Sequence, residues 1–228
     1  MMPALGLVIF DVDGTLIDSQ DFIYAAMTAA FDDIGRPAPS RAEVLAITGL
    51  SLPLALARLA PDLDADRIEA AVACYKTRYL GLRAAGGEAQ APLYPGARAA
   101  IEALHAQPEV LLGVATGKAR RGLDHSFAAH GLDRYFVTRQ TADGHPSKPH
   151  PSMIEAALAE TGVDRSRAIM VGDTTYDMEM AAAAGIAGLG VGWGYHPAAA
   201  LIGSGAVEVI ADFAALVPAV ARIWGDTA

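Results

Sequence analysis

Two aspartates, Asp11 and Asp13, directly follow the apolar segment 5–10 and are separated by a single residue. If that segment is a strand, its two-residue period points both carboxylates in the same direction. One carboxylate could then attack as a nucleophile while the other donates and accepts protons. Aspartates at strand ends are also common turn or capping residues, so this pair alone does not establish a catalytic site.

Two further motifs carry groups that suit a phosphate. Thr116 and Gly117 end a second apolar run, and a hydroxyl beside flexible backbone, ahead of an expected helix, suits a phosphate group. Lys148 precedes Pro149 at an expected junction of loop and helix, where its ammonium group could neutralise a phosphoryl oxygen and a nearby carboxylate. A strand-end threonine or a solvated lysine is common without a ligand, so each motif is weak evidence by itself.

The motif VGDTTYD places Asp173 at the end of an apolar run and Asp177 in or beside the first turn of the next helix. Carboxylates at a helix N-terminus also favour the helix dipole, which needs no ligand. If they gather with Asp11, however, their negative charge calls for a cation, and hard oxygen ligands suit Mg²⁺. The acidic residues therefore predict a magnesium cofactor.

These motifs depend on strands that bring distant parts of the chain together. Apolar runs predict strands at residues 5–10, 110–117, 167–173, 186–192 and 207–212, with a weaker candidate at 135–140. Helical stretches rich in alanine separate these runs, which predicts an α/β fold with a Rossmann-like parallel sheet covered by helices on both faces. Ligands bind at the carboxyl ends of the strands in such sheets, and every acidic motif falls at such an end.

Residues 19–90 contain no convincing strand and predict an α-helical cap domain inserted after the first strand. The catalytic core would then comprise residues 1–18 and 91–228. Within the insertion, apolar residues spaced by three or four predict one helix face. These residues are Ile68, Val72, Tyr75, Tyr79 and Leu82. The segment 86–96, rich in glycine and proline, is expected to return the chain to the core.

Composition limits the partners and the compartment. The chain has 228 residues, 53% of them hydrophobic, and a net charge of −9, which disfavours nucleic acid and anionic membrane surfaces as partners. The single cysteine, Cys74, forms no internal disulfide, which fits a reducing cytoplasm. No targeting segment or membrane span is expected, and the oligomeric state is not readable from the sequence.

Taken together, four motifs resemble in type and order those of the haloacid dehalogenase-like (HAD) hydrolase superfamily. They are DVDGTL, the threonine of ATGK, the lysine of SKPHP, and GDTTYD. The continuation GTLIDS, the helical insertion and the segment PLYPG extend the resemblance over essentially the whole chain, toward the subfamily that includes phosphoglycolate phosphatases. Gly117 is a departure, since many relatives carry asparagine there, and we interpret it as a variant that leaves the role of the Thr116 hydroxyl intact.

The resemblance implies a role for each matching residue. Asp11 is implied to be the nucleophile that forms an aspartyl-phosphate, and Asp13 the acid that protonates the leaving group and then activates water. The implied phosphate-binding residues are Thr116, Gly117 and Lys148. The implied Mg²⁺ ligands are the Asp11 and Asp173 carboxylates and the Asp13 backbone carbonyl, with Asp177 in a second shell that orients Lys148 or the water around the metal.

The expected function is thus Mg²⁺-dependent hydrolysis of a small phosphorylated metabolite, such as a phosphoglycolate-like compound or a sugar phosphate. Asp13 disfavours the related dehalogenases, which lack a second aspartate. A phosphomutase of the β-phosphoglucomutase type would share every core residue and remains an alternative. So does a phosphoacceptor signalling module, although receivers have no helical insertion. Substrate selectivity is expected to reside in the cap, where segment 48–51 is either a loop over the site or an ordinary turn between helices.

Overall fold

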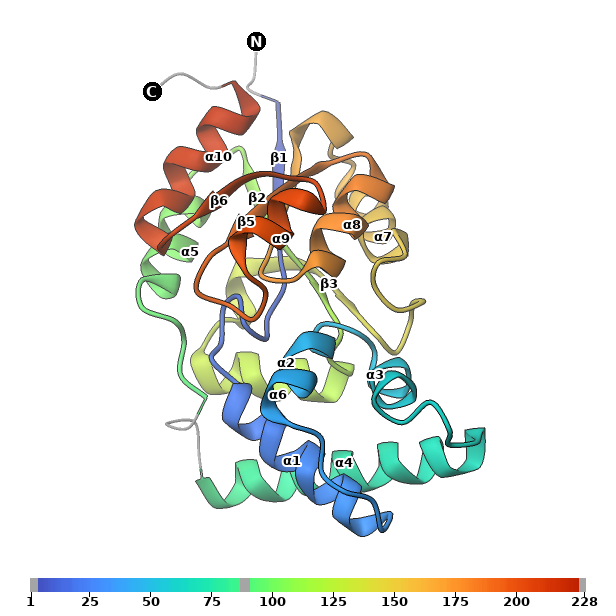
Figure 1. Cartoon of the computed structure of the whole chain (residues 1–228). Coiled ribbons are helices and arrows are strands. Elements are labelled where there is room, and N and C mark those ends of the chain that lie inside the picture. The colour runs from blue at the N-terminus through green and yellow to red at the C-terminus, as the bar shows by residue number, and fades with distance from the viewer. Residues whose placement is uncertain (1–3, 87–90, 226–228) are drawn as a thin grey trace.

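The structure, a computed structural model, describes residues 4–86 and 91–225. Within these residues six strands form one parallel sheet in the order β3-β2-β1-β4-β5-β6 (Figure 1). The strands are β1 (Gly6–Phe10), β2 (Val110–Thr116), β3 (Phe136–Thr141), β4 (Ala168–Gly172), β5 (Ala187–Val191) and β6 (Ala206–Ile210). Each of the six predicted strands is present, and the Rossmann-like α/β prediction is confirmed.

Two helical layers cover the sheet, because the central strands present apolar side chains on both faces. Val8 and Phe10 of β1 belong to the core cluster formed with α5 (Ala97–His105), α6 (Arg120–His130) and α10 (Leu216–Trp224). Leu7 and Ile9 belong instead to the cluster formed with α7 (Ser152–Thr161) and α8 (Thr175–Ala184). This alternation explains why β1 reads as a continuous apolar run.

The remaining elements lie at the edges of the sheet and in its connections. β3, an edge strand, leaves Val137 exposed and buries the polar residues Thr138, Gln140 and Thr141, and these polar residues explain why its apolar signal is weaker. The short helix α9 (Ala198–Gly203) packs beside β6. Single 3₁₀ turns occur at η2 (Asp133–Tyr135), η3 (Arg165–Arg167) and η4 (Phe213–Ala215).

Among the described residues between β1 and α5, four helices, α1 to α4, form what is called here the helical insertion (Figure 1). They are α1 (Gln20–Asp33), α2 (Arg41–Ile47), α3 (Leu52–Leu59) and α4 (Ala65–Gly86). Helix α1 packs along α4, and α2 begins at a capping box of Ser40 and Glu43, which satisfies its free backbone N–H groups. The predicted apolar face of α4 is confirmed, with Tyr79 buried and its companions partly buried against the core.

The insertion lies below the carboxyl ends of the central strands in Figure 1, and so covers the edge where ligands of parallel sheets bind. Its predicted end at residue 90 falls within 87–90, outside the described residues. The division into a core of residues 1–18 and 91–228 and a cap of residues 19–90 therefore stays a prediction. Helix α4 is the longest described helix, with 22 residues, yet no described helix combines the length and apolarity that a membrane crossing requires.

Candidate active site

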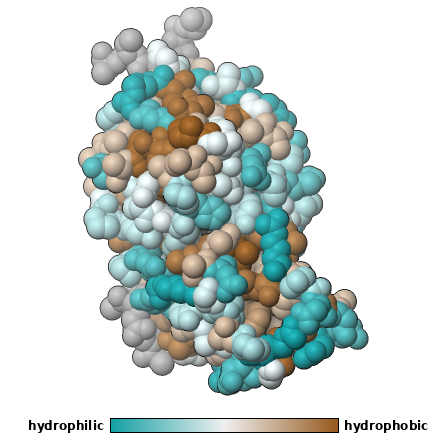
Figure 2. All heavy atoms as spheres, viewed as in Figure 1, coloured by the Kyte–Doolittle hydropathy of each residue, from teal (hydrophilic) through white to brown (hydrophobic). Residues whose placement is uncertain are grey.

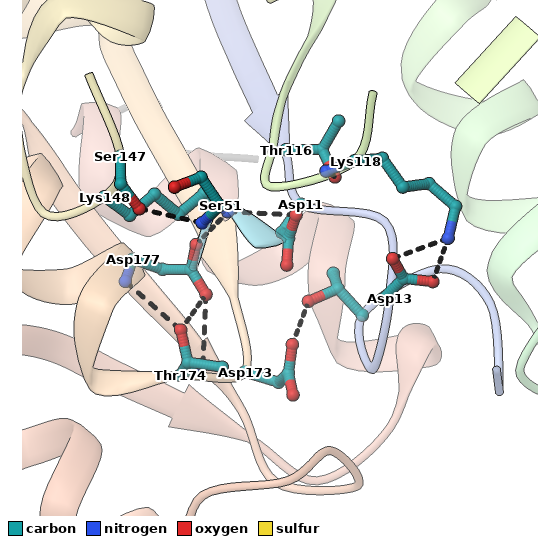
Figure 3. Close-up of polar contacts among 11 residues, drawn as sticks. Asp11, Asp13, Ser51, Thr116, Lys118, Ser147, Lys148, Asp173, Thr174 and Asp177 are labelled. Carbon is teal, nitrogen blue, oxygen red and sulfur yellow. Dashed lines mark hydrogen bonds and ion pairs between the residues drawn. The ribbon is translucent and has the colours of Figure 1, made fainter. Parts of the chain in front are cut away.

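The predicted site residues come together at the carboxyl edge of the sheet. Asp11 lies directly beyond β1, Thr116 ends β2, and Asp173 directly follows β4. Because β1 lies between β2 and β4, these strand ends are neighbours. Figure 3 shows Asp11 between Thr116 and Lys148, with Asp173 close by. The residues gathered in and around this site are Asp11, Asp13, Thr116, Gly117, Lys148, Asp173 and Asp177.

Lys148 is fully buried between two carboxylates. Its Nζ lies 2.9 Å from Asp11 Oδ1 and donates a hydrogen bond of 2.6 Å to Asp177 Oδ1. Burial by itself lowers the pKa of the Lys148 ammonium group, but the charges of Asp11 and Asp177 outweigh burial and hold that pKa above its usual value. The lysine therefore stays charged beside Asp11.

Asp177 is oriented by the first turn of α8. Its Oδ2 accepts hydrogen bonds from the backbone N–H of Thr174 at 3.1 Å and from the Thr174 hydroxyl at 2.7 Å, which forms a capping box at the start of the helix. The carboxylate therefore caps α8 with one oxygen while the other accepts from Lys148. Capping and lysine orientation, which the sequence offers as separate interpretations, occur together.

Three carboxylates form a buried acidic cluster at the centre of the site. Asp11, Asp173 and Asp177 each offer an oxygen, and these oxygens lie within 4.8 Å of one another. Burial raises the pKa of Asp11 to about 7, assisted by the charges of Asp177 and Asp13 and opposed by Lys148. Burial, followed by the charges of Asp11 and Asp177, also raises the pKa of Asp173 well above its usual value. When all three carboxylates are ionised, one lysine does not balance them, and the cluster then carries excess negative charge.

The donor set fits a hard divalent cation. Both carboxylate oxygens of Asp11 are buried, and apart from the ion pair of Oδ1 with Lys148 neither accepts a hydrogen bond from any described residue. Carboxylate oxygens are the ligands that Mg²⁺ prefers, and a cation would supply the missing countercharge. The acidic cluster contains Asp177, which the sequence assigned to a second shell, whereas the carboxylate of Asp13 is directed to another partner.

Asp173 is fixed by groups that the sequence analysis missed. Its Oδ1 accepts from the Thr15 hydroxyl at 2.9 Å, and its Oδ2 accepts from the backbone N–H of Tyr195 at 2.9 Å. Two glycines make room for it: a Cβ added at Gly14 would lie 2.2 Å from Asp173 Oδ2, and one at Gly194 would lie 2.1 Å from Asp173 Cβ. Gly14 also has a φ of 84°, a conformation that side chains disfavour. The glycine of DVDGTL, Gly14, therefore leaves room for the Asp173 carboxylate and allows the backbone conformation of this turn.

Asp13 is paired with Lys118, a residue for which the sequence analysis made no prediction. Lys118 Nζ lies 2.5 Å and 2.6 Å from the two carboxylate oxygens of Asp13 and donates to the Tyr79 hydroxyl at 3.2 Å. Burial alone lowers the pKa of Lys118, but Asp13 outweighs that effect and the pKa lies above its usual value. The Ser19 hydroxyl also donates to Asp13. The sequence signal that could have identified Lys118 is its position in the motif ATGK, two residues after Thr116.

Gly117 lies where the core meets the helical insertion. A Cβ at this position would lie 2.5 Å from the carbonyl oxygen of Gly49 and 2.7 Å from that of Leu50. The departure from asparagine thus has a steric explanation, since backbone of the insertion occupies that space. Thr116 is buried next to it, and its Oγ1 accepts from the backbone N–H of Lys118 at 3.2 Å.

Segment 48–51 lies over the site between α2 and α3. Thr48, Gly49 and Leu50 line the same cavity as Asp11, and the backbone N–H of Ser51 donates to Ser147 Oγ at 2.8 Å. Of the two interpretations that the sequence leaves open for this segment, the structure supports the loop over the site. A second hydrogen bond joins the core to the insertion: the Tyr176 hydroxyl of α8 donates to the Ala46 carbonyl of α2 at 2.9 Å.

The cavity beneath this segment has a volume of about 350 Å³, within the range of small-molecule sites. Asp11, Asp13 and Thr116 line it from the sheet, and side chains of α1, α3 and α4 line it from the insertion. The two parts of the chain therefore enclose the space in front of Asp11 together.

A parallel sheet with lysine-paired carboxylates at its central strand ends defines an α/β enzyme suited to an anionic substrate. Residues 8–191 match the family model described as haloacid dehalogenase-like hydrolase, and the chain belongs to that family. The resemblance to the branch that includes phosphoglycolate phosphatases is likewise confirmed by relatives and by solved structures.

Two relatives and one solved structure illustrate the similarity. A probable phosphatase, IndB, from Dickeya dadantii is 37% identical over 83% of this chain and 82% of its own length. A phosphoglycolate phosphatase from Vibrio parahaemolyticus is 29% identical over 83% of this chain and 85% of its own. The crystal structure of a hydrolase from Pseudomonas syringae has a TM-score of 0.84 and 25% identity, covering 96% of this chain and 99% of that one. The protein is a phosphatase.

Proposed function

We propose that this phosphatase hydrolyses a small phosphorylated metabolite in a Mg²⁺-dependent reaction through an aspartyl-phosphate on Asp11. One observation carries the proposal: apart from the ion pair of Oδ1 with Lys148 Nζ at 2.9 Å, neither oxygen of Asp11 accepts a hydrogen bond from a described residue, and Asp11 lines a cavity. A carboxylate with so few partners that faces a cavity is available for attack, and the lysine offsets the repulsion between two anions.

Substrate binding would use the groups around Asp11. Lys148 and the Thr116 hydroxyl would contact the phosphoryl oxygens, and the walls of the cavity would surround the alcohol. Asp11 and Asp173, with Asp177 or the Asp13 backbone carbonyl, would hold Mg²⁺. When bound, the metal would neutralise charge on the phosphoryl group and on the acidic cluster.

Hydrolysis would proceed in two displacements. In the first, an Asp11 oxygen attacks phosphorus, the bond between phosphorus and the alcohol oxygen breaks, and Asp13 gives that oxygen a proton. In the second, Asp13 takes a proton from water as the water oxygen attacks phosphorus, and the bond to Asp11 breaks to release inorganic phosphate. Asp13 is paired with Lys118, so proton delivery requires that pair to separate when substrate fills the cavity.

The arrangement also supports two wider inferences. The helical insertion covers the cavity and meets the core at Gly117 and Ser147, which supports a cap at residues 19–90 on a core of residues 1–18 and 91–228. Cys74 is a free thiol, which supports a reducing cytoplasm as the compartment. Phosphoglycolate, which the name of the Vibrio relative specifies, and sugar phosphates are candidate substrates.

The test is multiple-turnover release of phosphate from a panel of phosphorylated metabolites, with Mg²⁺ and with EDTA. We expect release that needs Mg²⁺ and is lost in Asp11→Asn, which keeps the size of the side chain and removes the nucleophile. Circular dichroism and thermal melting check that the variant folds. Wild-type turnover in Asp11→Asn would refute Asp11 as the nucleophile. Substrate isomerised without free phosphate would indicate a mutase, and release limited to one equivalent would indicate a phosphoacceptor module.

A further inference from the structure

The walls of the cavity on the side of the helical insertion are mostly apolar. The six apolar and aromatic side chains that matter most here are Ile23, Met27, Leu52, Tyr75, Tyr79 and Leu80. They come from α1, α3 and α4, and they line the same cavity as Asp11 and Thr116 at the carboxyl ends of β1 and β2. On the face shown in Figure 2, some hydrophobic side chains lie between the insertion and the core, beside hydrophilic ones. The part of a substrate that extends from the phosphate would therefore contact hydrocarbon.

Several polar side chains that line the cavity already have partners, while Lys76 and Arg121 add two charged side chains to its lining. The Thr48 hydroxyl donates to the Val44 carbonyl at 3.0 Å, and Lys118 is paired with Asp13. Asp143 accepts from the backbone N–H of Arg120 at 2.6 Å. The hydroxyl groups of a sugar would lose water on entering this space and find few replacements, which costs binding free energy.

Two tyrosines give the apolar wall a flat surface. The rings of Tyr75 and Tyr79 have centroids 5.8 Å apart and an interplanar angle of 19°. The Tyr79 hydroxyl accepts from Lys118 Nζ at 3.2 Å, and Lys118 in turn contacts both oxygens of Asp13. Asp13 is the proposed proton donor to the leaving oxygen, so the aromatic wall lies on the leaving-group side of the site.

We propose that the preferred substrate is a phosphate monoester of a bulky, largely apolar alcohol, with an aromatic or branched aliphatic group against Tyr75, Tyr79 and Leu80. The inference rests on the proposed hydrolysis at Asp11 and names its substrate class. A two-carbon acid such as glycolate would leave most of the 350 Å³ empty and the apolar side chains of the insertion uncovered. An apolar alcohol fills the same space and displaces poorly bound water.

The test compares phenylethyl phosphate with ethyl phosphate and phosphoglycolate, whose leaving alcohols differ little in intrinsic reactivity. The measured quantity is kcat/KM for phosphate release in the presence of Mg²⁺. We expect phenylethyl phosphate to exceed both of the others by at least about tenfold, because its ring would be buried against the apolar wall. Asp11→Asn should abolish release from all three, which ties the activity to the proposed site.

A matched pair of variants assigns the preference to the wall. Leu80 is 38% exposed, so Leu80→Ser carries little folding risk, and it should reduce the ratio of kcat/KM between phenylethyl and ethyl phosphate at least about threefold. Leu5, 46% exposed and absent from the cavity lining, provides the control, since Leu5→Ser should leave the ratio unchanged.

The outcomes separate the two proposals. If phosphoglycolate or ethyl phosphate is hydrolysed as efficiently as phenylethyl phosphate, the apolar-substrate inference is wrong while hydrolysis at Asp11 stands. An unchanged ratio in Leu80→Ser would equally overturn the role of the wall. If none of the three esters nor any panel metabolite yields phosphate, both proposals fail together.

Discussion

Asp13 and Lys118 form the contact with the most direct consequence for catalysis at the level of single residues. Both oxygens of Asp13 contact the lysine, and the Ser19 hydroxyl also donates to that carboxylate. These contacts orient Asp13 toward the cavity, whereas Asp11 contacts Lys148. Two aspartates separated by a single residue thus have different cationic partners, as the proposed division between nucleophile and proton carrier requires.

Asp13→Asn should separate the two proposed displacements. The amide keeps the size of the side chain and an acceptor for Lys118, but it carries no proton to transfer. Turnover of alkyl phosphates should fall about 100- to 10,000-fold. With p-nitrophenyl phosphate, whose leaving group needs no proton, we expect a rapid burst of one equivalent of nitrophenolate followed by slow turnover, because water still needs a base. Stopped-flow absorbance measures both phases.

The comparison with Asp11→Asn supplies the control, since that variant should give no burst at all. Unchanged steady-state turnover of alkyl phosphates in Asp13→Asn would remove Asp13 from proton transfer.

At the level of elements, the loop after β2 and the loop between α2 and α3 meet at Gly117. The space that a side chain would need is filled by the backbone of Gly49 and Leu50, and the Ser51 N–H reaches Ser147 nearby. These contacts place the insertion over Asp11 and make the cavity a joint product of two parts of the chain. The docking of the helices should therefore be sensitive to volume at Gly117.

Gly117→Ala should weaken this docking. The new Cβ would lie 2.5 Å from a backbone oxygen, so the loop must move, at a cost of about 1–3 kcal/mol in the free energy of unfolding. The displaced wall should lower kcat/KM at least about tenfold. Urea denaturation and steady-state kinetics measure the two effects.

Gly81→Ala is the matched control, because nothing lies within 4 Å of a Cβ at this helical position. It should be neutral or stabilise the protein by up to about 1 kcal/mol. If Gly117→Ala behaves like Gly81→Ala, the close approach at Gly117 has no energetic importance.

For the whole molecule, stability should depend on whether a cation balances the acidic cluster. Burial raises the pKa of Asp11 in the folded protein to about 7, above its ordinary value of 3.8. The resulting contribution to stability is complete below about pH 4 and is lost as the pH rises through about 7, because ionisation then favours the unfolded chain. Without a cation, the free energy of unfolding should therefore decrease between about pH 4 and pH 7.

Mg²⁺ should reverse this loss. At 100 times its dissociation constant, a ligand of the folded state adds about 2.7 kcal/mol, which corresponds to a rise in Tm of about 5–10 °C for a chain of this size. Differential scanning calorimetry at pH 8 with Mg²⁺ and with EDTA measures the shift. A Tm that does not respond to Mg²⁺ would contradict the proposed metal site.

Asp173→Asn is the control for charge. It removes one buried negative charge, and the amide can still bond to Thr15 and to the Tyr195 N–H. In EDTA its Tm should equal or exceed that of the wild type, because a buried unbalanced charge is costly. The corresponding gain in the free energy of unfolding is on the order of 1 kcal/mol. Its response to Mg²⁺ should be largely lost.

Much of the fold and of the site could be predicted from local patterns. Continuous apolar runs identify β1 and β4 because these strands are buried on both faces, and the residue after each run then lies at the carboxyl edge of the sheet. Asp11 and Asp173 are therefore placed by local periodicity. The expected junction of loop and helix at Lys148 and Pro149 is present, with both residues in the turn that precedes the start of α7 at Ser152.

The sequence by itself determined the types of strand-end residues, the parallel sheet and the resemblance to the family. Tertiary structure alone decided that Lys118 pairs with Asp13, that Gly117 admits the backbone of the insertion, and that the cavity walls are apolar. The physical reason is the separation of these residues along the chain. Hydrophobic periodicity reports on residues a few positions apart, whereas these contacts join distant segments. Their distances depend on how the insertion packs on the sheet.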